Sequence, residues 1–493
     1  MLFELLASAM INPDVSKMNL IAVANTKPKN VATVKTATAV KWPYTQSYLT
    51  PMKNKTPYAN FYEVTEHYKS DLTAVVKDFK TRNSDSKQFL KWVDLPTEQM
   101  TVHGTKSHLD EIYEQANKLK ARKTDVECPL VVLGIGGSKH TAEFLLNMNG
   151  LGNKGKVYFY SDIDPVSFSN FMKEVNHSIQ DLNFLVVSKS GTTFETKDAF
   201  TRFENMLIEY YKKQGLKDND AKVKAQSHFA ICTDKTATKA NLRGKIGHKN
   251  GKDNSYIKEL YIHDGVGGRF SMFDDAGLFV NAYAGFPKSK AIRMLKSAEK
   301  MSTFCLDENA HDNPAGLAAI FNVYSRDYGY KLTQQQYFGH LFETGGENWI
   351  KQLYLESLKD FDFVSSKAPD SMHYASEGFF YPQNRDKYHM VMTIMSPDIS
   401  ENYRKYVSAV LVSYLETAPV GLEILEVENG AIKPEAIGEY IQSKHFETVY
   451  SGMLRRQVAI TNTEKLPEVF QPHVEVYKNK FKPNSKYELT PGK

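Results

Sequence analysis

The feature that most constrains how this chain can fold is a strand, turn and helix pattern that begins at Pro129. In the stretch PLVVLGIGGSKHTAEFLL an apolar strand leads into a glycine-rich turn, and an amphipathic helix pattern follows. Four further strand patterns come after it, KVYFYSD, NFLVVS, HFAICTD and YIKELYI, with polar or helix-like stretches between them. Such alternation is typical of a parallel sheet with helices on both faces. The sequence therefore predicts an α/β fold with a doubly wound sheet.

A second α/β unit is expected downstream, because 493 residues are too many for one ordinary core. A helix-rich stretch opens near Lys288, and the apolar run HMVMTIMS follows at 389–396. Helix candidates at 399–416 and 434–455 flank the run EILEVEN. We expect an irregular and helical N-terminal arm at 1–122, a first domain at 123–285, a second domain at 286–462 and a helical C-terminal arm at 463–493.

Composition narrows the class of protein. Hydrophobic residues make up 41% of the chain and charged residues 24%, which is ordinary for a globular protein. The net charge of +5 is spread along the chain, so small anionic ligands fit better than nucleic acid. Three widely spaced cysteines predict neither a disulfide framework nor a zinc site, and they favour a reducing compartment such as the cytoplasm. The opening stretch MLFELLASAM is too short to span a membrane and lacks a basic leader.

The glycine turn GIGGS, residues 134–138, is a candidate anion site. It ends a strand pattern and opens a helix, where free backbone N–H groups and the helix dipole favour a bound anion. Gly137 and Ser138 stand at the predicted helix start. The turn does not fit the three-glycine dinucleotide pattern or the nucleoside triphosphate loop. The alternative explanation is a tight turn that serves packing only.

A second hydroxyl-rich turn, SKSGTTFET from Ser188 to Thr196, also follows a strand pattern and precedes a helix pattern. Five Ser and Thr hydroxyls within nine residues, together with the amides of a helix start, can donate several hydrogen bonds to a phosphate. The plainer explanation is a helix N-cap, since Ser and Thr are favoured there. A cap needs one hydroxyl, so the cluster favours phosphate binding.

Taken together, GIGGS and SKSGTTFET resemble the first sugar-isomerase (SIS) domain of the glucose-6-phosphate isomerase family. Three downstream segments resemble that family in the same order: GVGGRFSMFDDAGLF, NWIKQLYLES and FQPHVEVYK. The resemblance spans about residues 130–480. It implies two flavodoxin-like SIS domains with parallel-rich sheets, and a homodimer whose active site is shared between subunits. It also implies reversible isomerisation of glucose 6-phosphate to fructose 6-phosphate in glycolysis and gluconeogenesis, without a cofactor.

The resemblance assigns the catalytic roles. Aldose–ketose isomerisation through a cis-enediolate needs a carboxylate base, a group that stabilises oxyanion charge, and groups that open the sugar ring. Glu356 matches the base, Arg269 the enediolate stabiliser, and His373 and Lys478 the ring-opening groups. Their plainer explanations are a solvated helix carboxylate, a structural ion pair and ordinary polar or surface residues. The substrate-binding residues implied are Gly137, Ser138, Ser188, Lys189, Ser190, Thr193, Gln352 and Gln471.

Two alternatives stay open. One is an isomerase of the same fold for another hexose 6-phosphate, such as mannose or an amino sugar phosphate, since Leu358-Lys359 and His473 depart from the family pattern. The other is a non-catalytic sensor of sugar phosphates, which the absence of a helix-turn-helix pattern with a basic recognition face disfavours. No His, Cys or carboxylate group has the spacing typical of zinc or iron motifs, so no metal site is expected.

Overall fold

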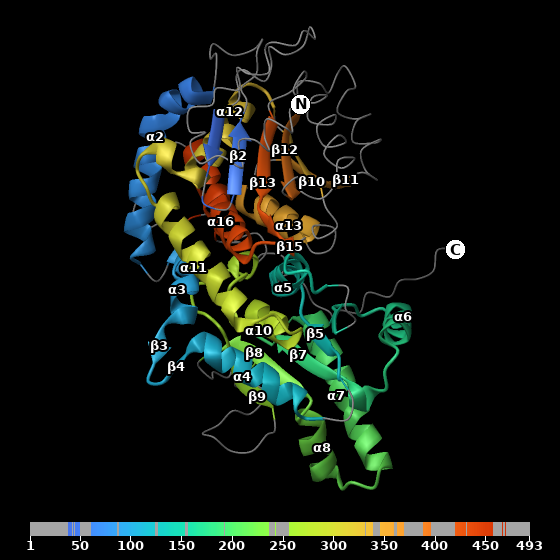
Figure 1. The fold of residues 1–493 in the computed structure, drawn as a ribbon. Coiled ribbons are helices and arrows are strands. Elements are labelled where there is room, and N and C mark those ends of the chain that lie inside the picture. The colour runs from blue at the N-terminus through green and yellow to red at the C-terminus, as the bar shows by residue number, and fades with distance from the viewer. Residues whose placement is uncertain are drawn as a thin grey trace, which may run out of the picture.

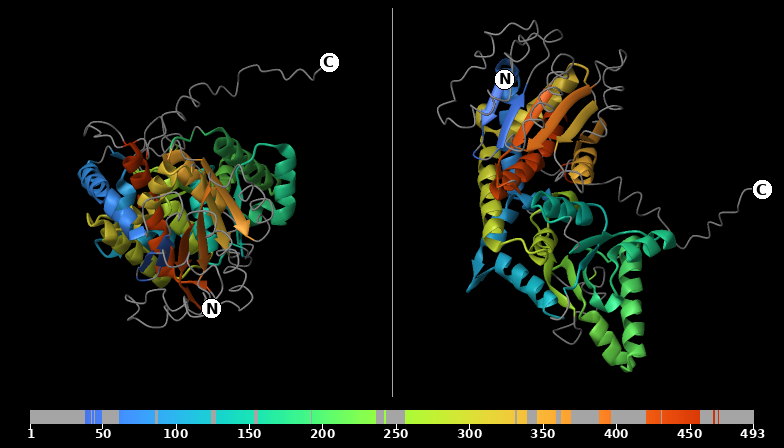
Figure 2. Two further views of the ribbon diagram at one scale, coloured as in Figure 1. Left: turned by 90° about the horizontal axis from the view of Figure 1, so that it is seen from above. Right: turned by 45° about the vertical axis from the view of Figure 1, so that its right-hand side comes forward.

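The computed structural model of the chain contains two α/β units, each built around one main sheet, stacked along the long axis of the molecule (Figure 1; Figure 2, right). The residues that it describes are 38–41, 43, 45–49, 61–85, 88–123, 127–152, 156–191, 193–235, 242, 256–330, 332–338, 346–358, 362–368, 388–395, 420–429, 431–456, 466 and 469.

The sheet of the first unit consists of five parallel strands in the order β6-β5-β7-β8-β9. These are β5 (Leu130–Leu133), β6 (Val157–Tyr160), β7 (Asn183–Val187), β8 (Phe229–Asp234) and β9 (Ile257–Ile262). All five lie within the strand patterns that the sequence predicts. Numbered along the chain, the order is 2-1-3-4-5, which is the flavodoxin-like order of a doubly wound sheet. The predicted α/β class is therefore confirmed.

Helices cover both faces of this sheet because successive strand residues point to opposite sides. Val131 and Leu133 pack in one apolar cluster with residues of three helices that follow the first strands. These are α6 (Pro165–Val175), α7 (Phe194–Lys213) and α8 (Asp218–Gln226). Leu130 and Val132 belong to the cluster on the other face, which α4 (His108–Lys120), α5 (Gly137–Met148) and α10 (Asp275–Tyr283) help to form.

The sheet of the second unit has the order β1-β2-β13-β12-β10-β11. Its four parallel strands are β10 (Leu332–Phe338), β11 (Asp362–Ala368), β12 (Tyr388–Met395) and β13 (Val420–Leu425). The antiparallel hairpin of β1 (Thr38–Lys41) and β2 (Thr45–Leu49) extends the sheet at β13. We expected an irregular segment before residue 60, so these two strands are a finding of the structure. They are short, and the pairing of β2 with β13 is a long-range contact without a local sequence signal.

Long helices surround the second sheet and fill the space beside it (Figure 1). They are α2 (Phe61–Asn83), α11 (Lys288–Cys305), α12 (Pro314–Asp327), α13 (Gly346–Leu358) and α16 (Pro434–Arg456). The short helix α3 (Leu95–Met100) packs on α11. Helix α16, which the sequence predicts at 434–455, is mostly buried and packs on α11 and α12. A Cβ on Gly438 would lie 2.1 Å from the Met294 carbonyl oxygen, so glycine permits this close approach. The helix predicted at 399–416 lies outside the described residues.

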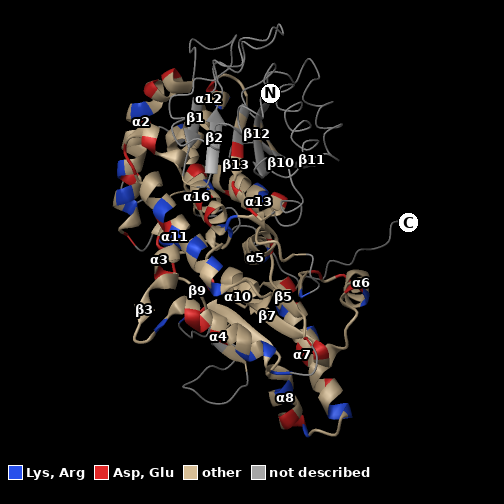
Figure 3. Cartoon of the chain, in the orientation of Figure 1, with Lys and Arg blue, Asp and Glu red and all other residues tan. Residues whose placement is uncertain are grey.

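The remaining elements are short. They are β3 (Val102–His103), β4 (Lys106–Ser107), β14 (Val427–Glu428), β15 (Ala431–Ile432), and the 3-10 helices η5 (Lys91–Val93), η6 (Ile179–Asp181), η7 (Gly268–Phe270) and η8 (Ala310–Asp312). Basic and acidic residues are interspersed along helices such as α2 and α7 (Figure 3). Within the described ranges, no helix combines the length and the apolar character that a membrane span requires. The domain boundaries given above stay predictions.

Candidate active site

The two predicted anion-binding turns leave neighbouring strands at the same edge of the first sheet. Strands β5 and β7 are parallel partners, with Leu133 opposite Val186. The GIGGS turn follows β5 and the SKSGTT turn follows β7, and a Cβ on Gly134 would lie 3.4 Å from the Val187 carbonyl oxygen. The strand order reverses between β5 and β7. Doubly wound proteins bind ligands at the carboxyl ends of the strands at such a point.

The glycines of the first turn allow a second loop to pack against the start of α5. Gly136 has φ +55° and forms the N-cap of α5, a conformation that favours glycine. A Cβ on Gly137 would lie 2.2 Å from the Gly268 carbonyl carbon and 2.6 Å from the Arg269 amide nitrogen. The packing explanation left open by the sequence therefore accounts for part of the need for glycine at 137. It also explains how Arg269 comes to lie beside a helix N-terminus, where anions are favoured.

The second turn is held by its own polar groups. The buried Ser188 Oγ accepts a hydrogen bond from the Gly191 amide at 3.0 Å, and Gly191 has φ +62°. Thr193 is the N-cap of α7, yet in the part of the chain that the structure describes its side chain makes no capping hydrogen bond. The plain N-cap explanation thus does not account for Thr193. The Lys189 ammonium lies 3.2 Å from Asp264 and 3.5 Å from Asp234, toward β8 and β9.

Arg269 connects the predicted residues of α13 with the glycine turn. Its side chain is only 1% exposed, and its Nη1 donates to Glu356 Oε2 at 3.1 Å. Its Nε donates to the Ser357 hydroxyl at 3.0 Å. The guanidinium also lies over the Phe270 ring, 4.9 Å from the centroid. A planar guanidinium with several fixed donors is well suited to hold a carboxylate or another oxyanion in one orientation.

Helix α13 brings the carboxylate and the amide of the predicted site together. Gln352 and Glu356 are one turn apart, and Gln352 Nε2 donates to Glu356 Oε1 at 3.0 Å. A Cβ on Gly136 would lie 3.4 Å from this Nε2, so the Gln352 side chain lies against the glycine turn. The Glu356 side chain remains 27% exposed, while its partner Arg269 is buried. Arg269 thus holds one oxygen of the Glu356 carboxylate and Gln352 holds the other, while the carboxylate remains partly exposed to solvent.

The structure therefore brings part of the predicted site together. Gly137, Arg269, Gln352 and Glu356 converge through direct contacts, and the turns that carry Ser138, Ser188, Lys189, Ser190 and Thr193 leave the same sheet edge. His373, Gln471 and Lys478 lie outside the described residues. Their roles stay predictions.

Three residues that we did not predict support this group. Trp349 donates its indole N–H to the Arg269 carbonyl at 2.9 Å and stacks on Phe144 of α5 at 4.7 Å. Ser357 accepts from the guanidinium, and His445 packs edge-on against Trp349. Burial, and then the charge of Arg269, lower the pKa of His445 to about 3, so the ring is neutral. Residues 349, 352, 356 and 357 are spaced so that they lie near one another on one helix, and this signal could have identified Trp349 and Ser357. His445 has no such signal.

The comparisons with known sequences agree on one family. The family model described as phosphoglucose isomerase matches residues 76–357. The glucose-6-phosphate isomerase of Clostridium novyi (strain NT) is 30% identical over 314 residues, which cover 61% of this chain and 62% of that protein. The glucose-6-phosphate isomerase of Staphylococcus epidermidis is 31% identical over 301 residues, 59% of each. The matched region thus spans about three fifths of these relatives.

Solved structures show the same fold at lower identity. A hypothetical protein from Thermus thermophilus has a TM-score of 0.66 at 18% identity and covers 85% of this chain and 96% of its own. A glucose-6-phosphate isomerase from Chlamydia trachomatis has a TM-score of 0.64 at 14% identity, with 90% and 88% covered. At such identities the likeness concerns the fold alone. The family match includes Arg269, Gln352 and Glu356, and it ends before His373, Gln471 and Lys478.

Proposed function

Because this chain belongs to the phosphoglucose isomerase family, we propose that it interconverts glucose 6-phosphate and fructose 6-phosphate. One observation carries the proposal: Glu356 is held by Arg269 and Gln352 beside the glycine turn at the switch point of the first sheet. A carboxylate, a permanent cation and an anion-binding helix start are the groups that proton transfer on a sugar phosphate requires.

Glu356 is the proposed base. Isomerisation moves a proton between C1 and C2 through a cis-enediolate, and one carboxylate can take the proton from one carbon and return it to the other. The exposed part of Glu356 gives the substrate access, while Gln352 and Arg269 fix its orientation. Arg269 is proposed to stabilise the oxyanion charge that develops on the enediolate. Because guanidinium stays charged at any working pH, this stabilisation needs no proton transfer.

The phosphate is proposed to lie between the two turns at the carboxyl ends of β5 and β7. Ser138, Ser188, Ser190 and Thr193 would donate hydroxyl hydrogen bonds, and the first amides of α5 and α7 would add backbone donors. The missing capping bond of Thr193, in the described part of the turn, is consistent with a hydroxyl available to a ligand. The Lys189 ammonium is already paired with Asp234 and Asp264, so it would bind the phosphate only after leaving these carboxylates.

Ring opening and assembly rest on the family resemblance. His373 and Lys478 are proposed to move protons at the ring oxygen and its hydroxyl, and Gln471 is proposed to bind near the phosphate. We also propose a homodimer with a shared active site that works in glycolysis and gluconeogenesis in the cytoplasm. The three cysteines are unpaired and buried, which agrees with the reducing compartment expected from the sequence.

A coupled assay of fructose 6-phosphate conversion tests the proposal directly. Wild-type protein should turn over fructose 6-phosphate, and Glu356→Gln should lose about 10²- to 10⁴-fold in kcat at unchanged folding. Glu347→Gln, the same change on the same helix, should stay within about twofold of wild type because Glu347 makes none of the contacts described for Glu356. A folded wild type that binds the sugar phosphate without turnover would contradict the proposal and favour a sensor. Faster turnover of another hexose 6-phosphate would identify that sugar phosphate as the preferred substrate.

A further inference from the structure

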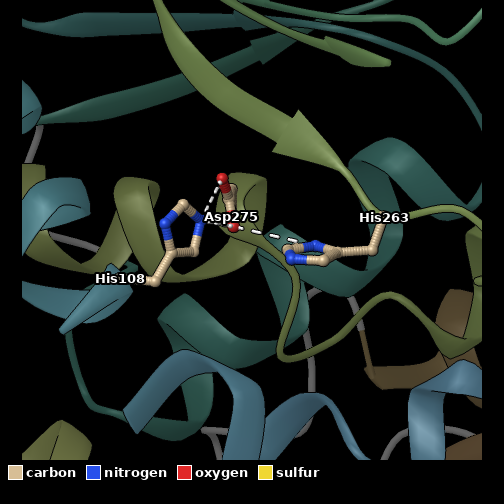
Figure 4. A group of neighbouring side chains, drawn as sticks. All are labelled: His108, His263 and Asp275. Atoms are coloured by element: carbon tan, nitrogen blue, oxygen red, sulfur yellow. Dashed lines mark hydrogen bonds and ion pairs between the residues drawn. The ribbon is translucent and has the colours of Figure 1, made fainter. Parts of the chain in front are cut away.

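A second group of titratable side chains lies at the base of the loop that carries Arg269. One ligand atom from each of His108, His263 and Asp275 lies within 4.8 Å of the others (Figure 4). His108 is the first residue of α4, His263 directly follows β9, and Asp275 begins α10. Three separate elements therefore meet at this point. The loop that carries Arg269 begins at His263 and ends at Asp275, so both of its ends lie here.

Charge balance makes this group unusual. Asp274 and Asp275 are neighbours in sequence, and both carboxylates are buried. His263 Nδ1 lies 2.6 Å from Asp274 Oδ1, and His108 Nε2 lies 2.9 Å from Asp275 Oδ2. Two buried carboxylates require compensating positive charge. Two imidazolium rings can provide it, and so can one divalent cation between two neutral rings.

The outer contacts of His108 and Asp275 orient their ligand atoms as in a metal site. His108 Nδ1 lies 2.9 Å from Glu111 Oε2, so the other ring nitrogen is directed at Asp275. Metal-bound histidines commonly donate their second N–H to such a carboxylate. The Asp275 carboxylate is fixed by the Gln99 amide at 3.1 Å and the Tyr261 backbone N–H at 2.7 Å.

The separations also suit a shared ion. Two ligands at right angles on bonds of about 2.1 Å lie about 3 Å apart, and ligands on opposite sides lie about 4 Å apart. The distances to one carboxylate oxygen, Asp275 Oδ1, are 3.0 Å from His108 Nε2 and 3.9 Å from His263 Nδ1. The two imidazole side chains are 13% and 23% exposed, so the group is in contact with solvent.

We infer that His108, His263 and Asp275 bind a divalent transition-metal ion such as Zn²⁺, Co²⁺ or Ni²⁺. Two imidazoles and one carboxylate suit these ions, whereas Mg²⁺ and Ca²⁺ prefer oxygen ligands alone. The ion would tie the start of α4 to both ends of the Arg269 loop and thereby stabilise the fold. It would not touch Glu356 or take part in isomerisation. The ligands at 108, 263 and 275 have no short spacing, which is why the sequence predicted no metal site.

Metal titration of the stripped protein tests this inference independently of any enzymatic activity. Protein treated with EDTA and exchanged into a non-chelating buffer at pH 7.5 is titrated with Co²⁺ and Zn²⁺. We expect one saturable site with micromolar or tighter affinity, d–d absorption from bound Co²⁺, and a higher Tm with the ion present. His108→Ala and His263→Ala should each weaken binding at least about tenfold. His177→Ala, which alters an exposed histidine outside the group, should bind as wild type does.

A milder variant separates loss of the site from loss of the fold. Glu111→Gln leaves all three ligands in place on an exposed position and should weaken binding about tenfold, with an unchanged Tm for the metal-free protein. Two outcomes would overturn the inference. One is the absence of saturable binding to wild type, which would mean that protons alone hold the two aspartates. The other is equal binding by wild type, His108→Ala and His263→Ala.

Discussion

At the residue scale, the orientation of Arg269 depends on Ser357 and Trp349 as well as on the predicted base Glu356. Its Nε is bound by Ser357, its Nη1 by Glu356, and its backbone carbonyl by Trp349. All of these partners are on α13. A guanidinium that must meet a developing charge needs its position fixed to a fraction of an ångström. Ser357 and Trp349 are therefore positioning residues in this account.

Ser357→Ala should lower kcat about tenfold while KM changes less than about threefold. The change removes one acceptor from a buried guanidinium, so the loss should fall on stabilisation of the transition state. Steady-state kinetics in the coupled assay measure both constants. Ser325→Ala removes a buried hydroxyl on α12 and serves as the control, with kinetics expected to match wild type. An equal loss in both variants would mean that Ser357 acts through general stability alone.

At the element scale, the strands and helices of the first unit could be predicted because each has a local signal. Runs of four to six residues rich in apolar side chains, set between polar or helix-like stretches, mark β5 to β9, and the glycine and hydroxyl turns mark the starts of α5 and α7. The hairpin β1–β2 could not be predicted, since its stability comes from pairing with β13 some 370 residues away. The same limit applies to contacts between elements: no local pattern shows that α5 packs against η7.

Gly137→Ala tests that contact between α5 and η7. The added methyl group would lie 2.2 to 2.6 Å from backbone atoms of Gly268 and Arg269, which cannot rotate away. We expect a loss of about 3 kcal/mol in the free energy of unfolding, or a displaced Arg269 loop and reduced activity. Urea denaturation with the coupled assay measures both. Gly267→Ala is the matched control, because its nearest neighbour would lie 3.5 Å away. Equal effects of the two substitutions would contradict the contact.

At the scale of the whole molecule, the site joins parts of the chain that the sequence keeps far apart. The turn at 134–138, the loop around Arg269 and helix α13 lie together because the second unit packs onto the first, and the turn that begins at Ser188 leaves the same sheet edge because β5 and β7 are neighbours. Residue types at family positions were enough to predict roles for Arg269, Gln352 and Glu356, and the structure brings these three side chains together. Their partners Trp349, Ser357 and His445, and the cluster of His108, His263 and Asp275, required the folded chain.

Global stability should depend on pH through buried His228. Its Nδ1 donates to the Leu182 carbonyl at 2.8 Å, and its Nε2 accepts from Tyr211 at 2.7 Å and from Arg122 at 3.2 Å. Burial, and then the charge of Arg122, lower its pKa to about 3, whereas the unfolded ring titrates near 6.5. The unfolded chain therefore binds this proton first. Stability present above pH 6.5 is lost as pH falls toward 3, by about 1.4 kcal/mol per unit.

Urea unfolding at pH 7 and pH 5 measures this effect. The loss of stability between the two should be about 2 kcal/mol smaller in His228→Gln than in wild type, even though the variant is less stable at pH 7. Groups common to both proteins cancel in this difference. An identical pH dependence of the two proteins would contradict the neutral assignment of His228.

The central claim is that Glu356, held by Arg269 and Gln352, carries a proton between two carbons of a sugar phosphate. Isomerisation of fructose 6-phosphate in D₂O, followed by NMR of the product, tests it most directly. A proton held on a partly exposed carboxylate can exchange with solvent, so wild type should incorporate deuterium at the carbon that receives the proton, and Glu356→Gln should lose both isomerisation and exchange. Fast isomerisation by wild type without any deuterium in the product, or undiminished exchange in Glu356→Gln, would contradict the account.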